Sequence, residues 1–137
     1  MFAATLLAAL SACATKSISV PPNLVVAAVQ PRTLPTPPVM PPNAPPQIVR
    51  MWISTLTIVP GIWFDGTIVA STNVASVEVR TAAFSINSAH VAPGLFRFHA
   101  RILELPPLSR RHSYDLAIIA RNTAGVEQVE HATLSVK

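Results

Sequence analysis

The chain has 137 residues, of which 50% are hydrophobic and only 12% are charged, which excludes a chain that is disordered throughout and leaves room for one domain of ordinary size. Its formal charge of +4 comes from basic residues that are mixed with acidic ones along the chain. This scatter argues against a nucleic-acid partner, because nucleic-acid binders gather Lys and Arg on one face. A single cysteine, Cys13, excludes an internal disulfide.

The N-terminus begins with a short apolar run over residues 2–10, which ends in Leu10-Ser11-Ala12-Cys13. The run is shorter than the ~20 residues that a helical membrane span needs, and it has the length of the hydrophobic part of a signal peptide. Leu10-Ser11-Ala12-Cys13 resembles the lipobox of bacterial lipoproteins. The resemblance implies a signal peptide over residues 1–12 and an acylated Cys13 that anchors the mature chain in a membrane.

Two other interpretations of this segment stay open. No Lys or Arg precedes the apolar run, where a signal peptide usually carries positive charge, so the true start could lie upstream. Cleavage after Ala14 would give a soluble periplasmic protein, and an ordinary buried helix with an inert cysteine would give no export. Under the lipoprotein interpretation, Ala14 stands where an Asp often retains such proteins at the inner membrane. This favours the outer membrane of the cell envelope.

A proline-rich segment follows over residues 13–46. Ten of the 14 prolines in the chain lie between Pro21 and Pro46. Proline has no backbone N–H donor and is disfavoured in helices and central strands, so the segment is expected to form an extended, semi-rigid linker. The apolar stretch over residues 24–29 could form an edge strand or a short helix.

Residues 47–137 alternate between apolar and polar side chains in short runs, bounded by turn residues such as Pro60-Gly61 and Pro93-Gly94. Alternation with a period of two is typical of β-strands. About seven such runs, with turns every 8 to 12 residues, predict an all-β immunoglobulin-like sandwich for residues 47–137.

The sharpest local pattern runs from Tyr114 to Gly125, Tyr-Asp-Leu-Ala-Ile-Ile-Ala-Arg-Asn-Thr-Ala-Gly. It resembles the sixth strand and following hairpin of fibronectin type III and bacterial immunoglobulin-like domains. The resemblance implies an inward Tyr114 with Leu108 at the tyrosine-corner spacing. Asn122 and Gly125 tolerate the positive φ that the turn asks for. The chain has no cysteine pair, which argues against an antibody-type domain.

Motifs for catalysis are not evident in the sequence, so we expect no enzyme activity, no cofactor and no bound metal. The four histidines have no metal-ligand spacing and are expected to be solvated or on strand faces: His90, His99, His112 and His131. Asp65-Gly66 is interpreted as a turn, because no further acidic residues follow at the spacing of a calcium loop.

Trp52 and Trp63 are the best candidates for a binding surface, because aromatic side chains on a sandwich face stack on sugar rings or anchor protein interfaces. The alternative is that both cover the edge of the core where the linker meets the domain. Arg110 and Arg111 precede the sixth predicted strand. They could contact anionic lipid or polysaccharide, or they could be ordinary solvated charges.

The sequence therefore predicts an exported, lipid-anchored envelope protein that presents an immunoglobulin-like module for binding or structure and not for catalysis. Two alternatives are a carbohydrate-binding module that uses Trp52 or Trp63, and an accessory subunit of an envelope complex. The expected partners are the membrane, through acylated Cys13, and an envelope protein or polysaccharide.

Overall fold

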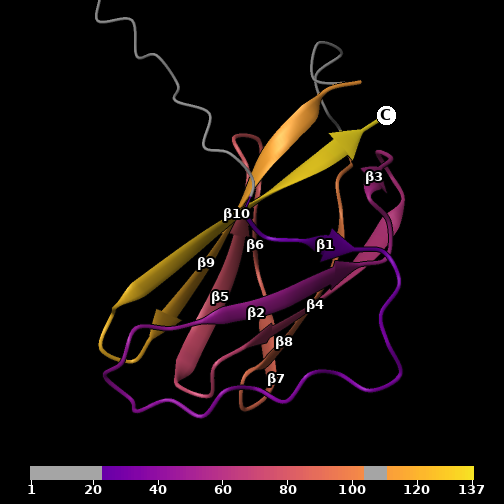
Figure 1. The fold of residues 1–137 in the computed structure, drawn as a ribbon. Coiled ribbons are helices and arrows are strands. Elements are labelled where there is room, and N and C mark those ends of the chain that lie inside the picture. Colours follow the sequence, from indigo (N-terminus) through magenta and orange to yellow (C-terminus); the bar gives the residue numbers. More distant parts are fainter. Residues whose placement is uncertain (1–22, 104–110) are drawn as a thin grey trace, which may run out of the picture.

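Every regular element in the described part of the chain is a β-strand (Figure 1). The computed structural model describes residues 23–103 and 111–137. The strands form two sheets of five strands each, with the hydrophobic core between them. The segment predicted as a signal peptide, Cys13, Leu108 and Arg110 lie outside the described residues.

The first sheet, sheet A, has the strand order β1-β2-β4-β8-β7. In that order its strands span Val26–Ala27, Ile48–Ile53, Trp63–Ala70, Leu95–Arg101 and Ala89–Ala92. Neighbouring strands are antiparallel except for β1, which pairs parallel to β2.

The second sheet, sheet B, has the strand order β3-β10-β9-β5-β6. In that order its strands span Thr57–Ile58, Glu127–Val136, Ser113–Asn122, Val74–Arg80 and Ser85–Asn87. Here β3 pairs parallel to the C-terminal strand β10, and the other pairs are antiparallel.

The strand order is that of an immunoglobulin-like sandwich, as the sequence predicts. The order β2-β4-β8-β7 corresponds to strands A, B, E and D of that fold, and β10-β9-β5 corresponds to G, F and C. The three other strands, β1, β3 and β6, have only two or three residues each and lie at sheet edges. They bring the total in the described residues to ten instead of about seven.

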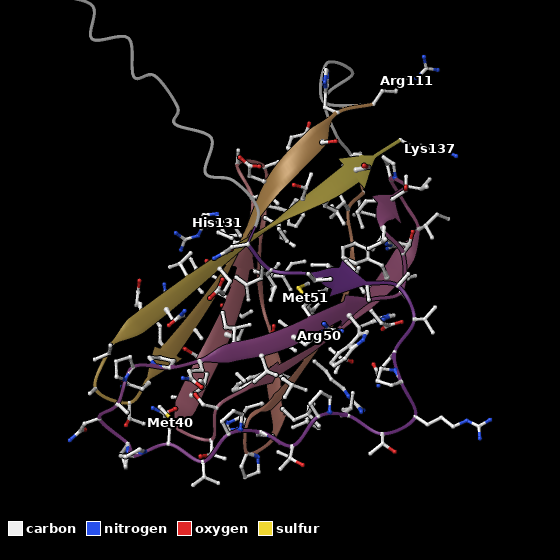
Figure 2. All side chains as sticks on the ribbon, viewed as in Figure 1. Met40, Arg50, Met51, Arg111, His131 and Lys137 are labelled. Carbon is white, nitrogen blue, oxygen red and sulfur yellow. The ribbon has the colours of Figure 1, made fainter. Side chains whose placement is uncertain are left out.

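The predicted alternation puts large apolar side chains between the sheets. In sheet B, Val77 and Val79 of β5 face the core together with Leu116 and Ile118 of β9. In sheet A, Met51 of β2 is fully buried, and its side chain lies between the sheets in Figure 2. Each large apolar side chain buried in this way contributes about 1.5–3 kcal/mol, so the core can stabilise the fold without a disulfide.

Asp65-Gly66 lies inside β4, which differs from the predicted turn. Gly66 faces the core, where a Cβ atom built on it would meet Cζ of Phe98 at 2.0 Å. The glycine therefore makes room for the ring of the neighbouring strand β8, to which Gly66 pairs directly. Because successive residues of a strand point to opposite faces, Asp65 is turned to the outer face of sheet A.

The proline-rich segment lies along the sandwich, which differs from the extended linker expected from its composition. We call residues 28–46 the strap; in Figure 1 the strap passes from β1 around one end of the sandwich to β2. The backbone N–H of Thr72 donates to the Pro38 carbonyl at 2.9 Å, and Met40 N–H donates to Oγ1 of Thr72 at 3.2 Å. Prolines lack donors but keep their carbonyl acceptors, so the strap docks mainly through carbonyls.

Two asparagines of the sandwich hold the far end of the strap. Nδ2 of Asn73 donates to the carbonyls of Pro41 and Ala44 at 3.1 and 2.7 Å, and Nδ2 of Asn122 donates to the Ala44 carbonyl at 3.0 Å. Asn122 is buried, and its Oδ1 accepts the Val126 N–H at 2.9 Å. Arg111 is the only non-glycine residue with positive φ in the described part of the chain, so Asn122 serves as a side-chain clamp and not as a positive-φ turn residue.

The chain before the strap also joins the two sheets. The backbone N–H groups of Asn23 and Leu24 both donate to the His131 carbonyl of β10, in sheet B. Two residues later the chain pairs with β2 of sheet A through Val26 and Ala27. Residues 23–46 thus add a strand and a cover to the domain predicted at residues 47–137.

Candidate functional site

The outer face of sheet A, the side away from the core, carries an exposed group of aromatic and charged side chains. Trp63 and Asp65 project from β4, and Arg101 and His99 lie opposite them on β8 in antiparallel register. The alternation of both strands, with Phe64 and Phe98 inward, turns all four side chains outward. We call Trp63, Asp65, His99 and Arg101 the Trp63 cluster.

The members of the Trp63 cluster hold one another. The rings of Trp63 and His99 stack with centroids 4.3 Å apart and planes inclined by 6°. Cζ of Arg101 lies 4.8 Å from the centroid of the Trp63 ring, a cation–π distance. Nδ1 of His99 lies 2.6 Å from Oδ1 of Asp65. These contacts fix the orientation of Trp63, which nevertheless remains 51% exposed.

A shallow hollow of about 570 Å³ adjoins the Trp63 cluster. Its polar lining comes from Gln30 of the strap, Asp65 and Thr67 of β4, and Arg97 and His99 of β8. Arg97 forms no salt bridge in the described part of the chain. The hollow therefore combines hydrogen-bonding groups with a cation that has no counter-charge of its own.

Trp52 lies on the same outer face but is not available for binding. Its neighbours Met51 and Ile53 point into the core, so Trp52 of β2 points outward, yet only 4% of it is exposed. Ala28 and Gln30 of the strap line a small hollow together with Trp52. Trp52 thus matches the interpretation of a tryptophan covered where the proline-rich segment meets the domain, whereas Trp63 does not.

The other residues singled out in the sequence lie elsewhere. Arg111 is exposed just before β9, in sheet B, with a φ of 60°. Tyr114 is half-buried and packs against the core at the start of β9. Gly125 has a φ of 80° in the turn between β9 and β10. These residues therefore support the fold or its edge and do not join the Trp63 cluster.

The outer face of sheet B carries charges that neutralise one another. Glu78 of β5 accepts from Arg80 Nε at 2.9 Å, Arg121 Nη1 at 3.0 Å and Ser85 Oγ at 2.6 Å. Arg121 also donates to Glu127 at 2.6 Å. The hydrogen bond from Ser85, followed by those from Arg80 and Arg121, lowers the pKa of Glu78 from 4.5 to about 2. We call these five residues the Glu78 network.

Across residues 23–103 and 111–137, no three His, Cys, Asp or Glu side chains come together as ligands of a metal ion. The same ranges contain no helix of the length and apolarity needed to cross a bilayer.

The sequence indicated Trp63 but missed Asp65, Arg97, His99 and Arg101. The signal was present, because Arg97, His99 and Arg101 alternate with apolar residues along one predicted strand. What the sequence lacked was the register that places this strand beside Trp63 and Asp65. Because Asp65-Gly66 was predicted to be a turn, Asp65 was not placed on the same strand as Trp63.

Comparison with known proteins identifies no relative by sequence. No protein family matches the chain, and no curated protein matches it. Among solved structures, a mutant of the SrpA adhesin from Streptococcus sanguinis is similar in fold, with a TM-score of 0.44 and 16% identity. The match covers 68% of this chain and 57% of the adhesin chain, so this chain spans little more than half the adhesin's length.

Proposed function

We propose that this chain is a non-catalytic binding module of the bacterial cell envelope, held by a lipid on Cys13, with the Trp63 cluster as its contact face. The observation that carries the proposal is the half-exposed Trp63, held by His99 and Arg101 on the outer face of sheet A. Tryptophan and arginine are the residues that most often dominate binding energy at protein surfaces.

The arrangement supports binding over a purely structural role. A structural tryptophan on a sheet face is expected to be covered, as Trp52 is on this same sheet. Trp63 instead leaves about half of its surface in water, although Arg101 and His99 already restrict its motion. A restricted, exposed aromatic side chain loses little conformational entropy when a ligand covers it.

The contact face can be tested by site-specific photo-crosslinking in intact cells. A photoreactive amino acid at position 89, an exposed residue at the rim of the hollow, is expected to capture an envelope component. The same group at position 76, exposed on sheet B, is the control and should capture none. Adding Trp63→Ala should abolish capture from position 89. Equal capture from both positions, or capture that survives Trp63→Ala, would contradict the proposed face.

The lipid anchor is supported by the pattern Leu10-Ser11-Ala12-Cys13. Its test is the intact mass of the protein from the membrane fraction, compared with a Cys13→Ala variant. The proposal expects a chain that starts at an acylated Cys13 and a variant that lacks this mass. An unacylated chain that starts after Ala14 would indicate a free periplasmic protein, and an uncut chain would refute export by this route.

A further inference from the structure

The hollow beside Trp63 combines three features that together define a class of ligand. Its lining residue His99 stacks on Trp63, other lining side chains can form hydrogen bonds, and Arg97 and Arg101 lie on either side of His99 along β8. We propose that this hollow binds a saccharide that carries a carboxylate group, such as a uronic-acid unit of an envelope polysaccharide. This inference rests on the proposed function and specifies the ligand of its contact face.

Arg97 is the group that would receive the carboxylate. It is exposed and lines the hollow, and it forms no salt bridge in the described residues. Its planar guanidinium matches a carboxylate with two parallel hydrogen bonds. Arg101, four residues further along β8 on the same face, adds a second positive charge.

Asp65 does not cancel this positive character. Its carboxylate is turned to His99, with Oδ1 2.6 Å from the imidazole Nδ1. Formal charges on the two strands therefore amount to two arginines against one aspartate that already has a hydrogen-bonding partner. An anionic ligand would meet a net positive surface beside Arg97.

The rest of the hollow suits a sugar ring. His99 of the lining stacks on Trp63, which lies half-exposed beside the hollow, and the exposed part of the indole can pack against the C–H side of a pyranose. Thr67 and Gln30 supply a hydroxyl and an amide to the same hollow, which can both donate to and accept from sugar hydroxyls. The volume of about 570 Å³ lies within the range of small-molecule sites.

Other ligand classes fit these residues less well. An apolar peptide would desolvate Arg97 without giving its charge a partner. A nucleic-acid strand needs a basic track over many residues, and here one arginine, Arg97, lines a hollow that also contains Asp65. The lining is polar, and Arg97 is the one group in it that is placed to bind a carboxylate. These features favour a saccharide that brings one carboxylate into the hollow.

The test measures binding of defined oligosaccharides to the immobilised full chain, purified in detergent. The probes are oligogalacturonate and the same oligosaccharide with its carboxylates methyl-esterified, so that only the charge differs. The acid form is expected to bind about tenfold or more tightly than the ester, because hydrogen bonds to a charged group are stronger than neutral ones. Equal affinity for the acid and the ester would overturn the inference.

Single substitutions test whether Arg97 is the residue that binds the carboxylate. Arg97→Gln should weaken binding of the acid about tenfold and leave the ester unchanged. The matched control, Arg80→Gln, removes the same charge from sheet B and should change neither affinity. If both arginine variants weaken the acid equally, the effect is diffuse charge attraction and the inference fails.

Trp63→Ala separates this inference from the proposed function. The inference expects both probes to lose affinity, because the ring contacts the sugar and not its charge. If Trp63→Ala leaves both affinities unchanged, the contact face itself is wrong. If neither probe binds while the crosslink from position 89 still depends on Trp63, the saccharide ligand is wrong and the proposed face stands. Urea unfolding of each variant shows whether it is folded.

Discussion

The two tryptophans of this chain lie on one face of one sheet and have opposite surroundings. Trp52, on β2, is 4% exposed and shares a small hollow with Ala28 and Gln30 of the strap, and Trp63, on β4, is 51% exposed beside a hollow that its neighbours Asp65 and His99 line. Neither contributes to the core between the sheets. The strap therefore divides the outer face of sheet A and leaves the end at Trp63 open.

The strongest test of this division is Trp52→Ala. Removing a large buried side chain is expected to destabilise the fold by about 3–5 kcal/mol, because the strap cannot fill the space that the ring leaves. Urea unfolding measured by circular dichroism gives this value. A change as small as that of Trp63→Ala would show that the strap does not cover Trp52.

Loss of the Asn122 side chain, which holds the far end of the strap, should have the next largest effect on the free energy of unfolding. Asn122→Ala removes the hydrogen bonds to the Ala44 carbonyl and from the Val126 N–H, although the Ala44 carbonyl keeps the hydrogen bond from Asn73. The expected loss is about 1–3 kcal/mol in the free energy of unfolding. Thr123→Ala, at the exposed next residue, is the control and should change stability little. If the two variants are equally stable, the clamp does not hold the strap.

The Glu78 network on sheet B predicts that the stability of the fold depends on pH. The pKa of Glu78 is about 2 in the folded chain against 4.5 for an unperturbed glutamate. Because the folded pKa is depressed, the stabilisation is complete above about pH 4.5 and is lost as the pH falls from there towards 2.

Unfolding midpoints between pH 2 and pH 7 would show this loss. Glu78→Gln should be less stable than the native chain at neutral pH and should vary less over the acidic range. Glu127→Gln, at the exposed end of the same network, retains Glu78 and should keep the dependence. An acid response of Glu78→Gln as steep as that of the native chain would contradict the network.

The smallest effect on stability is expected from Trp63→Ala. The side chain is half in water, and its contacts with Arg101 and His99 are surface contacts worth about 1 kcal/mol or less. The same change should abolish capture of the envelope partner. Thermal unfolding together with crosslinking from position 89 would show both. A large loss of stability would make Trp63 a structural residue.

Much of the fold followed from local pattern. The alternation of inward Val77 and Val79 with polar neighbours, like that of Leu116 and Ile118, predicted the inward faces. Six of the seven strands of the immunoglobulin-like order fall in such runs, and the exception is β7, which was not predicted. The strap was predicted to be an extended linker because its many prolines lack backbone N–H donors. Proline content indicates only which hydrogen bonds the backbone cannot donate. It does not report what the strap's carbonyls can accept from Asn73 and Asn122.

The candidate site was only partly predictable, for a related reason. Trp63 was recognisable by its type, but its partners depend on which strand lies beside β4 and in which register. His99 is 36 residues further along the chain, and no local pattern joins it to Trp63. The surroundings of Trp52 likewise include residues that precede it by more than 20 positions, Ala28 and Gln30, which line a hollow with it.

The most direct test of the central claim is acrylamide quenching of tryptophan fluorescence in two variants. The chain has two tryptophans, so Trp52→Phe leaves only Trp63 and Trp63→Phe leaves only Trp52. We expect strong quenching of Trp63 and weak quenching of Trp52, since 51% and 4% of the two residues are exposed. Equal quenching in two folded variants would show that the strap does not divide the face, and it would remove the basis for placing the binding site at Trp63.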